Sequence, residues 1–358
     1  MAGRDVTVGR LCRWRWGAIA LAGCLLLFAG CLFSGCGSKN DAGEVVIYCA
    51  LDQNFSEAIL KEFEKRTGIA VRAQYDLEAS KSVGFYQKIK EDMNRPRCDV
   101  FWNNELMLTV CLKQRGALAP YISPAAAEIP DSFKDPEGFW TGFAARARVF
   151  IVNTDLLPER DAWPSSYRDL VDPARRSQGG LARPFAGTTA THGTILFQVL
   201  GEERAKAFFE GIVANDVNMT PGNAHLMRSV RQGDFAFGFT DTDDFNVARL
   251  EKFPVEAVYP DQGEGEPGTL VIPNSVALIK GGPNPDNAKK LIDYILSTEV
   301  EEKLAFADSA QIPLRKAVKR PEHVEVPGVD FRAMVVDFEK AADEYEARQQ
   351  LFYEIFMK

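Results

Sequence analysis

Residues 233–246 read GDFAFGFTDTDDFN, and this stretch decides the fold. Its first half, residues 235–239, is a short apolar run after a Gly-Asp turn, which is typical of a strand buried in a parallel sheet. The second half is polar, so Asp241, Asp243 and Asp244 are predicted to lie in the loop that leaves this strand. Open α/β sheets bind their ligands at the carboxyl ends of strands. The alternative is a solvated turn in which Asp244 caps the next helix.

The amino end has the features of an export signal. Four arginines among the first 15 residues precede an apolar run at residues 17–33, and the run ends at Ser-Gly-Cys. This pattern predicts a lipoprotein signal at residues 1–35, with Cys36 as the lipidated residue and residues 36–43 as a tether. A membrane-spanning anchor is the alternative, because about 17 apolar residues nearly suffice to cross a bilayer.

Composition and charge limit the class of protein. The chain has 358 residues, of which 46% are hydrophobic and 26% charged, enough for two domains with cores. The net charge is −8, and removing residues 1–35, with four arginines and one aspartate, leaves −11. Such an acidic chain argues against a nucleic-acid partner. Cys49, Cys98 and Cys111 follow the signal without metal-site spacing, and we expect buried thiols rather than a disulfide.

Strand and helix patterns alternate in two series, from residue 44 and again from residue 180. Strands are expected at residues 45–48, 69–74, 99–102, 180–182, 217–219 and 235–239, and helices at residues 55–67, 83–93, 189–200, 205–213, 223–231, 285–296 and 299–307. Such alternation implies parallel α/β sheets. Long extended runs at residues 140–153 and 269–279 flank the second series and predict two hinge strands.

The predicted fold class is therefore α/β, with two lobes and a ligand cleft between them. The first lobe is expected to contain residues 44–145 and 274–325, and the second lobe residues 146–273 and 326–358. Residues 331–356 read as one or two amphipathic helices that pack across the second lobe.

Polar residues gather at the predicted carboxyl edges of both sheets. The candidate ligand-binding residues are Asp52, Gln53, Asn104, Glu105, Arg146, Thr188, Thr189, Asn223, Thr240 and Asp241, and the candidate metal ligands are Asp243 and Asp244. Thr188 and Thr189 open a predicted helix, where free N–H groups and the helix dipole favour an anion. An ordinary threonine cap without a ligand is the alternative. His192 lies one turn into that helix and is expected to pack behind the site.

Five segments of the chain resemble the periplasmic ferric-iron-binding proteins, which are type II extracellular solute-binding proteins of ABC importers. The segments are residues 48–67, 98–102, 142–153, 221–223 and 233–244, within a similarity that runs from about residue 44 to 307. This resemblance implies the two-lobed periplasmic-binding-protein fold, hinge closure around a solute, and delivery of the solute to a membrane permease.

The resemblance also implies roles for individual residues. In that family, two adjacent tyrosines after the strand that matches residues 235–239 hold iron, and an anion completes the shell. Asp243 and Asp244 stand where the tyrosine pair is expected. The positions that match the first-lobe ligands are Asp52 and Asn104, with Glu105 adjacent, and those that match the anion contacts are Thr188, Thr189, Asn223 and Asp241. Arg146 matches the hinge arginine near the anion, and a salt bridge at the hinge is the alternative role for it.

Adjacent carboxylates raise each other's pKa unless a cation lies between them, so a cationic group in the ligand is expected. Carboxylates also form a less selective oxygen site than phenolates, one that suits divalent ions. The primary hypothesis is a cargo of ferric iron or another metal with a synergistic anion. The alternative is a zwitterionic phosphonate or phosphorylated amine.

A secreted metal-dependent hydrolase is a distant alternative, because acidic loops near a histidine could activate water. The chain has only three histidines and no HExxH or nucleophile-elbow motif. We therefore expect a binding protein without an obligatory cofactor rather than an enzyme. It is expected to act as an extracytoplasmic monomer, anchored to the membrane by a lipid on Cys36, with an ABC permease of the inner membrane as its partner.

Overall fold

The computed structural model describes residues 43–75 and 82–357. The predicted signal, the lipidation site at Cys36 and the tether up to residue 42 lie outside the described residues. In the described ranges, no helix has both the length and the apolar character needed to cross a bilayer.

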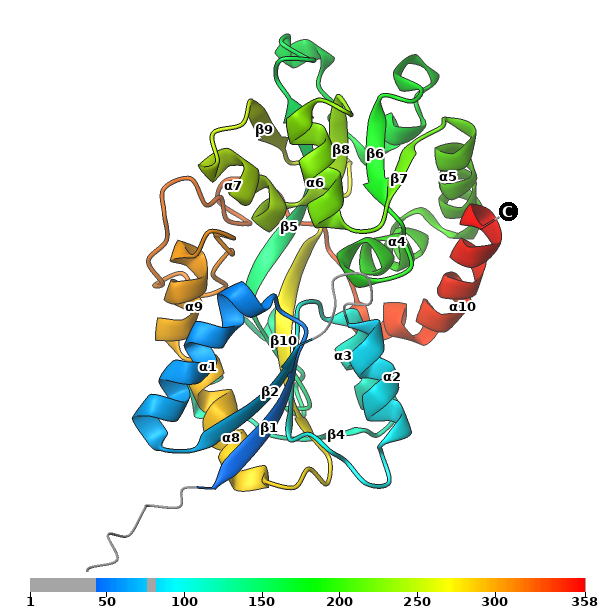
Figure 1. The fold of residues 1–358 in the computed structure, drawn as a ribbon. Helices are drawn as coiled ribbons and strands as arrows, with labels where there is room; N and C mark the ends of the chain where they lie inside the picture. The colour runs from blue at the N-terminus through cyan, green and yellow to red at the C-terminus, as the bar shows by residue number, and fades with distance from the viewer. Residues whose placement is uncertain (1–42, 76–81, 358) are drawn as a thin grey trace, which may run out of the picture. The chain divides into compact units, whose positions relative to one another are not determined.

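Strands and α-helices alternate along most of the described chain (Figure 1). The strands are β1 (Glu44–Cys49), β2 (Ala70–Tyr75), β3 (Val100–Asn103), β4 (Leu118–Ala119), β5 (Thr141–Asn153), β6 (Gly179–Ala182), β7 (Asn218–Thr220), β8 (Phe237–Asp241), β9 (Val255–Val258) and β10 (Val271–Ile279). The helices are α1 (Gln53–Thr67), α2 (Val83–Glu91), α3 (Met107–Gln114), α4 (Gly187–Leu200), α5 (Glu202–Ala214), α6 (Asn223–Gln232), α7 (Thr242–Leu250), α8 (Pro285–Ile295), α9 (Thr298–Phe306) and α10 (Phe338–Phe356).

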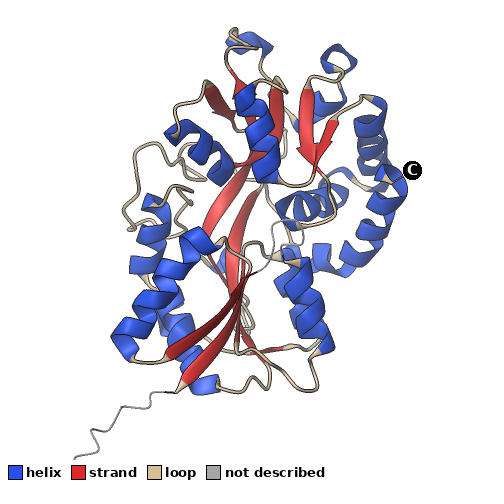
Figure 2. Cartoon of the chain, in the orientation of Figure 1, coloured by secondary structure: helices blue, strands red, loops and turns tan. Residues whose placement is uncertain are grey.

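The sheet contains two sets of parallel strands. The first set contains β1, β2 and β3, and the second set contains β6, β7 and β8. The order of strands is β2-β1-β3-β10-β5-β8-β6-β7, so the antiparallel pair of β5 and β10 joins the two sets. Helices flank the strands on both sides (Figure 2). The predicted α/β class and the two long extended runs are confirmed, whereas the predicted lobe boundaries stay predictions.

A β-bulge interrupts the pairing of β5 with β10. Ala145 pairs with Pro273, but Phe143 pairs with Asn274, so Ala144 is the extra residue. Ala144 has φ 40°, in the left-handed region that residues other than glycine rarely occupy. The side-chain amide of Asn274 donates a hydrogen bond to the carbonyl of Ala144 and holds this geometry. The bulge therefore bends the strand pair between the two strand sets.

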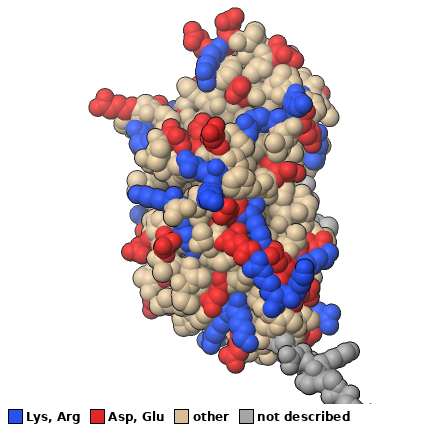
Figure 3. All heavy atoms as spheres, turned by 90° about the vertical axis from the view of Figure 1, so that its left-hand side faces the viewer, with Lys and Arg blue, Asp and Glu red and all other residues tan. Residues whose placement is uncertain are grey.

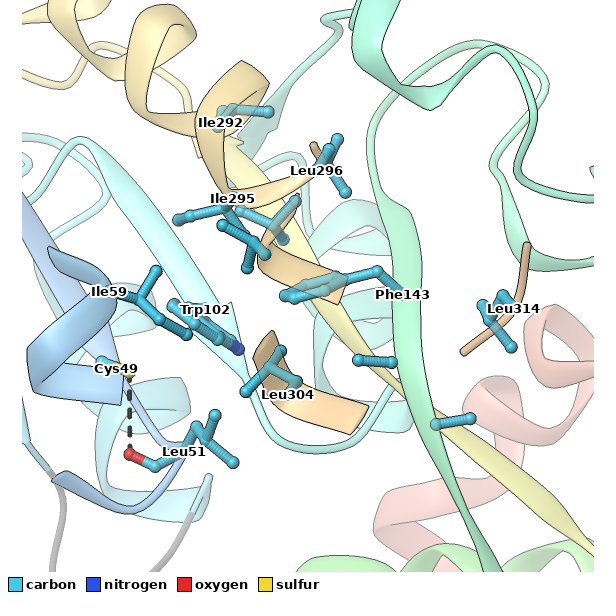
Figure 4. Close-up of a cluster of buried hydrophobic side chains, with 14 of the residues drawn as sticks. Cys49, Leu51, Ile59, Trp102, Phe143, Ile292, Ile295, Leu296, Leu304 and Leu314 are labelled. Carbon is cyan, nitrogen blue, oxygen red and sulfur yellow. Dashed lines mark hydrogen bonds between the residues drawn. The ribbon is translucent and has the colours of Figure 1, made fainter. Parts of the chain in front are cut away.

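The core beside the first strand set lies between buried strands and the apolar faces of helices. The rings of Trp102 and Phe143 lie 5.4 Å apart, and Ile59, Ile295 and Leu304 belong to the same buried cluster (Figure 4). Ile59 comes from α1, which ends where Gly68 takes a left-handed conformation with φ 74°. The predicted helix at residues 55–67 and its end at a glycine are confirmed.

The three cysteines after the signal are buried thiols, as predicted. The thiol of Cys49 donates to the carbonyl of Leu51 at 3.6 Å (Figure 4). Burial raises the pKa of Cys111 to about 12, and burial likewise raises the pKa of Cys98. Thiols with raised pKa are poor nucleophiles, because the thiolate is the reactive form.

The carboxyl-terminal segment forms one helix, α10, rather than two. Phe352 packs against Phe209 of α5, with 4.8 Å between ring centroids. At its other end α10 contacts α3, where Lys113 lies 2.8 Å from Glu339. The helix therefore contacts elements on both sides of the strand pair β5 and β10, not only the predicted second lobe.

Acidic and basic side chains are interspersed over the face that carries α1, α7 and α9 (Figure 3). Glu299 of α9 pairs with Arg66 at 2.5 Å and with Lys303 at 2.7 Å. Exposed ion pairs of this kind add little to stability. The mixed charge is typical of a solvated surface.

Candidate functional site

A cavity of about 470 Å³ lies among the first turns of four helices, α1, α4, α6 and α7. Asp52 and Phe55 at the start of α1 and Asn104 after β3 line it from the first strand set. Arg146 of β5 also contributes to the lining. The predicted rims of both sheets therefore meet at one cavity.

The N-termini of these four helices border the cavity. The N-cap residues are Asp52 for α1, Ala186 for α4, Gly222 for α6 and Asp241 for α7, and none of these side chains caps its helix by a hydrogen bond. Gly187, the first residue of α4, has φ 60°, which favours glycine. Uncapped N–H groups and the helix dipoles favour an anionic group in the cavity.

The aspartates at the end of β8 are arranged differently from the prediction. No loop separates β8 from α7: Asp241 is the last residue of the strand, and Asp243 and Asp244 lie in the first turn of the helix. The predicted aspartate loop is therefore wrong, because the acidic residues suit the positive end of a helix dipole. All three aspartates line the cavity, and one carboxylate oxygen from each lies within 4.8 Å of the others.

Asp241 is held by a buried network that includes Arg148, a residue that the sequence analysis missed. Its Oδ1 accepts a hydrogen bond from Arg148 Nη1 at 2.8 Å, and its Oδ2 accepts from Asn223 Nδ2 at 2.8 Å and from the Thr188 hydroxyl. Arg148 also donates to the Thr189 hydroxyl at 3.4 Å. The residues expected to hold an anion are therefore gathered around a carboxylate of the chain itself.

The strand pattern contained a signal for Arg148. In β5, Arg146 and Arg148 are two residues apart, so they lie on the same face of the strand. Two arginines on one face of a buried strand need carboxylate partners, and the sequence offers these at Asp241 and Asp243.

Arg146 is buried, with 2% of its side chain exposed, and its Nε lies 3.1 Å from Asp243 Oδ2. It also donates to the carbonyl of Asn104. Burial alone would lower the pKa of Arg146, but the carboxylates around it, Asp243 foremost, raise the pKa above its usual value. Arg146 therefore stays cationic and joins the end of β3 to the start of α7.

Three of the candidate residues lie outside the lining of this cavity. Glu105 is 1% exposed and accepts hydrogen bonds from the backbone N–H of Leu108 at 3.1 Å and from the Thr191 hydroxyl at 2.9 Å. Burial raises its pKa. Gln53 lies in the exposed first turn of α1, and the Thr240 hydroxyl donates to Asp244 Oδ2 at 2.9 Å. Glu105 and Thr240 therefore form hydrogen bonds within the protein instead of lining the cavity.

Two exposed arginines that the sequence analysis missed line the cavity, Arg183 and Arg228. Arg183 follows β6 directly, and Arg228 lies in the second turn of α6. Among the described residues, neither side chain has an ion-pair partner. The signal for Arg183 was its place at the carboxyl end of a strand, the edge where the other candidates were found.

The charges of the cavity nearly balance. In the described lining, four carboxylates, from Asp52, Asp241, Asp243 and Asp244, face the guanidinium groups of Arg146, Arg183 and Arg228. Arg148 adds a fourth positive charge behind Asp241. The acidic groups lie at the starts of α1 and α7, whereas Arg183 follows β6 and Arg228 lies in the second turn of α6. Such a site can bind a solute that carries both signs of charge.

Comparisons with known proteins identify relatives that are named for different solutes. The model of the family described as bacterial extracellular solute-binding protein matches residues 104–332, more than half of the chain. A putative 2-aminoethylphosphonate-binding periplasmic protein of Salmonella paratyphi A is 27% identical over 71% of this chain and 72% of that protein. Iron uptake protein A1 of Synechocystis is 26% identical over 80% of this chain and 84% of that protein.

The crystal structure of iron-bound HitA from Pseudomonas aeruginosa superposes with a TM-score of 0.79. The two chains are 22% identical, and the match covers 87% of this chain and 99% of HitA. This similarity confirms the predicted two-lobed periplasmic-binding-protein fold. The sheet topology, the cavity at the strand ends and the matched family model agree, and the chain belongs to the bacterial extracellular solute-binding proteins.

Proposed function

We propose that this chain is the binding component of an ABC importer for a small zwitterionic solute, an aminophosphonate or a phosphorylated amine. Its role as a solute-binding protein of such importers follows from its family. The anionic group of the solute would bind at the N-termini of α4 and α6 with Arg183 and Arg228. The ammonium group would bind at Asp243 and Asp244.

The balance of charges around the cavity carries this proposal. A solute with separated charges leaves no uncompensated charge when the cavity excludes water, whereas burying an unpaired ion is costly. The cavity of about 470 Å³ also offers room for an organic molecule. The relative in Salmonella paratyphi A, with 2-aminoethylphosphonate in its name, supports the same class of solute.

Ferric iron or another metal with a synergistic anion is the second candidate. The three aspartates with oxygens within 4.8 Å of one another favour it, as do relatives named for iron uptake. Two observations favour a zwitterionic solute over a metal ion as the cargo. The described lining contains no tyrosine, histidine or cysteine, and the carboxylates of Asp241 and Asp243 already contact Arg148 and Arg146. Two guanidinium groups beside the carboxylates disfavour a trivalent cation.

Transport would follow from closure of the two strand sets around the solute, which favours the closed form by its higher affinity for that form. Delivery to a permease from outside the cytoplasm would agree with the names of the periplasmic relatives. A lipid on Cys36 would keep the protein at the membrane. A binding protein of this kind releases its solute unchanged, so we expect no catalysis.

A thermal-shift comparison tests the proposal. The purified protein is heated with 2-aminoethylphosphonate, phosphoethanolamine, ethylphosphonate, ethanolamine, or ferric ion with phosphate or citrate. We expect a saturable rise in melting temperature with the first two compounds, larger than the rise with ethylphosphonate or ethanolamine at the same concentration. At a ligand concentration 100-fold above Kd, binding adds about 2.7 kcal/mol to the free energy of unfolding. A rise with ferric ion and anion, and none with either zwitterion, would reverse the order of the two candidates.

A further inference from the structure

A second, much smaller cavity lies behind the wall that carries Thr189. It measures about 20 Å³ as the space open to a water molecule, and Thr189 lines both cavities. Besides Thr189, three polar side chains contribute to its lining, those of Arg148, Tyr167 and His192. Apolar rings, among them Phe239, complete the wall.

Each of these polar side chains has a buried atom without a hydrogen-bond partner among the described residues. The atoms are the Nε of Arg148, the hydroxyl oxygen of Tyr167 and the Nε2 of His192. The three residues are 0%, 1% and 4% exposed. Buried polar atoms almost always have partners, and leaving one unsatisfied is unfavourable. All three residues line the same cavity, so one ligand there would serve as a shared partner.

The size of the cavity matches a single water molecule. A buried water needs about 10–15 Å³ by this measure and two to four polar partners. The cavity offers about 20 Å³ and three partners.

The charges favour a neutral ligand over an anion. Asp241 compensates Arg148 at 2.8 Å. Burial, together with the nearby Arg148, lowers the pKa of His192 well below its usual value, so the imidazole is neutral. Burial raises the pKa of Tyr167, so the phenol keeps its proton. Arginine Nε–H only donates, and the Nε2 of a neutral imidazole can accept, so the ligand must both accept and donate.

We propose that one water molecule binds in this cavity and bridges Arg148, Tyr167 and His192. It accepts a hydrogen bond from Nε–H of Arg148 and donates to Nε2 of His192 and to the hydroxyl oxygen of Tyr167. With these three hydrogen bonds, each of the three orphaned atoms has a partner.

The water would set the orientation of the Arg148 guanidinium. The other nitrogens of that group hold Asp241 and the hydroxyls of Thr188 and Thr189 at the floor of the large cavity. Tyr167 and His192 do not line the large cavity. They are therefore positioning residues that act on the solute site through the water and Arg148.

A crystal structure of the full chain without added solute tests the site itself, independently of the cargo. We expect one density peak within about 2.6–3.2 Å of all three orphaned atoms. The peak should persist in His192→Gln, which keeps an acceptor, and should disappear in His192→Leu. An empty cavity, or an anomalous peak there after a bromide soak, would overturn the proposal, the latter by identifying an anion.

Titration with 2-aminoethylphosphonate tests the positioning role, and this arm rests on the proposed function. Tyr167→Phe is expected to weaken binding about two- to tenfold, since one bond to the water is lost. Tyr294→Phe is the matched control, because the Tyr294 hydroxyl oxygen is also buried without a partner among the described residues, but its partly buried ring packs against the core of the first strand set. Equal affinities of the two variants would exclude the positioning role. If neither wild type nor variant binds this probe, the proposed cargo fails, and the density peak alone decides the water site.

Discussion

Arg148 and Asp241 form a buried ion pair at the floor of the large cavity, with side chains 1% and 5% exposed. Removing one partner of such a pair leaves an uncompensated charge, which costs about 3–5 kcal/mol. Arg148→Met is therefore expected to lower the free energy of unfolding by about that amount in urea titrations. The double variant Arg148→Met with Asp241→Leu should recover most of the loss. If Arg148→Met alone were as stable as wild type, solvent would already screen the ion pair.

Asp244 and Arg228 are predicted to recognise opposite ends of the solute. Asp244→Asn removes the charge but keeps an oxygen for the Thr240 hydroxyl, so binding of 2-aminoethylphosphonate should weaken tenfold or more, about 1.4 kcal/mol. Binding of ethylphosphonate, which has no ammonium group, should be unchanged in this variant.

The complementary variant is Arg228→Ala, which should weaken binding of both compounds in the same calorimetric titrations. Arg95, an exposed arginine outside the lining, is the control, and Arg95→Ala should bind like wild type. If Asp244→Asn lowered the affinity for 2-aminoethylphosphonate and for ethylphosphonate equally, Asp244 would not recognise the ammonium group.

Asp261 is predicted to make stability depend on pH. It is fully buried, and burial raises its pKa to about 6 from 3.8. The folded state thus holds the proton more tightly, so this stabilisation is present below pH 3.8 and is lost as pH rises through about 6.

Asp261→Asn imitates the protonated carboxyl, and asparagine tolerates the φ of 60° at this position. At pH 7 the variant should be more stable than wild type by at most about 3 kcal/mol. The difference should shrink toward pH 4 in unfolding titrations. A difference that is constant across this range would show that Asp261 does not titrate as stated.

At the residue scale, the sequence predicted which positions reach the cavity better than it predicted their partners. Asp52, Thr188 and Asn223 follow strand ends, Asp241 is the last residue of β8, and all four line the cavity. The contacts of Glu105 could not be predicted, because a carboxylate after a strand can either face the cleft or accept bonds from the next helix. The structure has the second arrangement.

At the scale of elements, periodicity predicted most strands and helices, but it missed α3, β4 and β9 and misplaced the boundary between β8 and α7. Residues 240–244 read as a turn because threonine and aspartate are common in turns. The same residues also favour the first turn of a helix, where aspartate complements the dipole, and tertiary contacts decide between the two. In the structure, Thr242 begins α7, and its hydroxyl accepts a bond from the backbone N–H of Ala147.

Helix α10 is predicted to depend on one aromatic anchor. Phe352 is fully buried against Phe209 and Phe197. Phe352→Ala would remove this packing and leave a cavity, at a cost of about 3–5 kcal/mol. Glu354→Ala, on the exposed face of the same helix, should stay within about 0.5 kcal/mol of wild type. Similar melting curves for the two variants would show that α10 contributes little to folding.

At the scale of the whole molecule, sequence order alone predicted that two α/β units are joined by two long strands. The bulge at Ala144 could not be predicted, because its φ of 40° is imposed by the pairing of β5 with β10. The charge balance of the cavity also required the structure, since Arg183 and Arg228 reach the cavity from positions 45 residues apart in the sequence, 183 and 228.

The central claim is that the cavity binds both charges of one small solute. Calorimetric titration of the purified protein with 2-aminoethylphosphonate and with its N-acetyl derivative, which lacks the positive charge, tests this claim most directly. We expect binding of one 2-aminoethylphosphonate per chain and affinity at least about tenfold lower for the acetylated compound. Equal affinity for both compounds, or one-to-one binding of ferric ion with no binding of either, would contradict it.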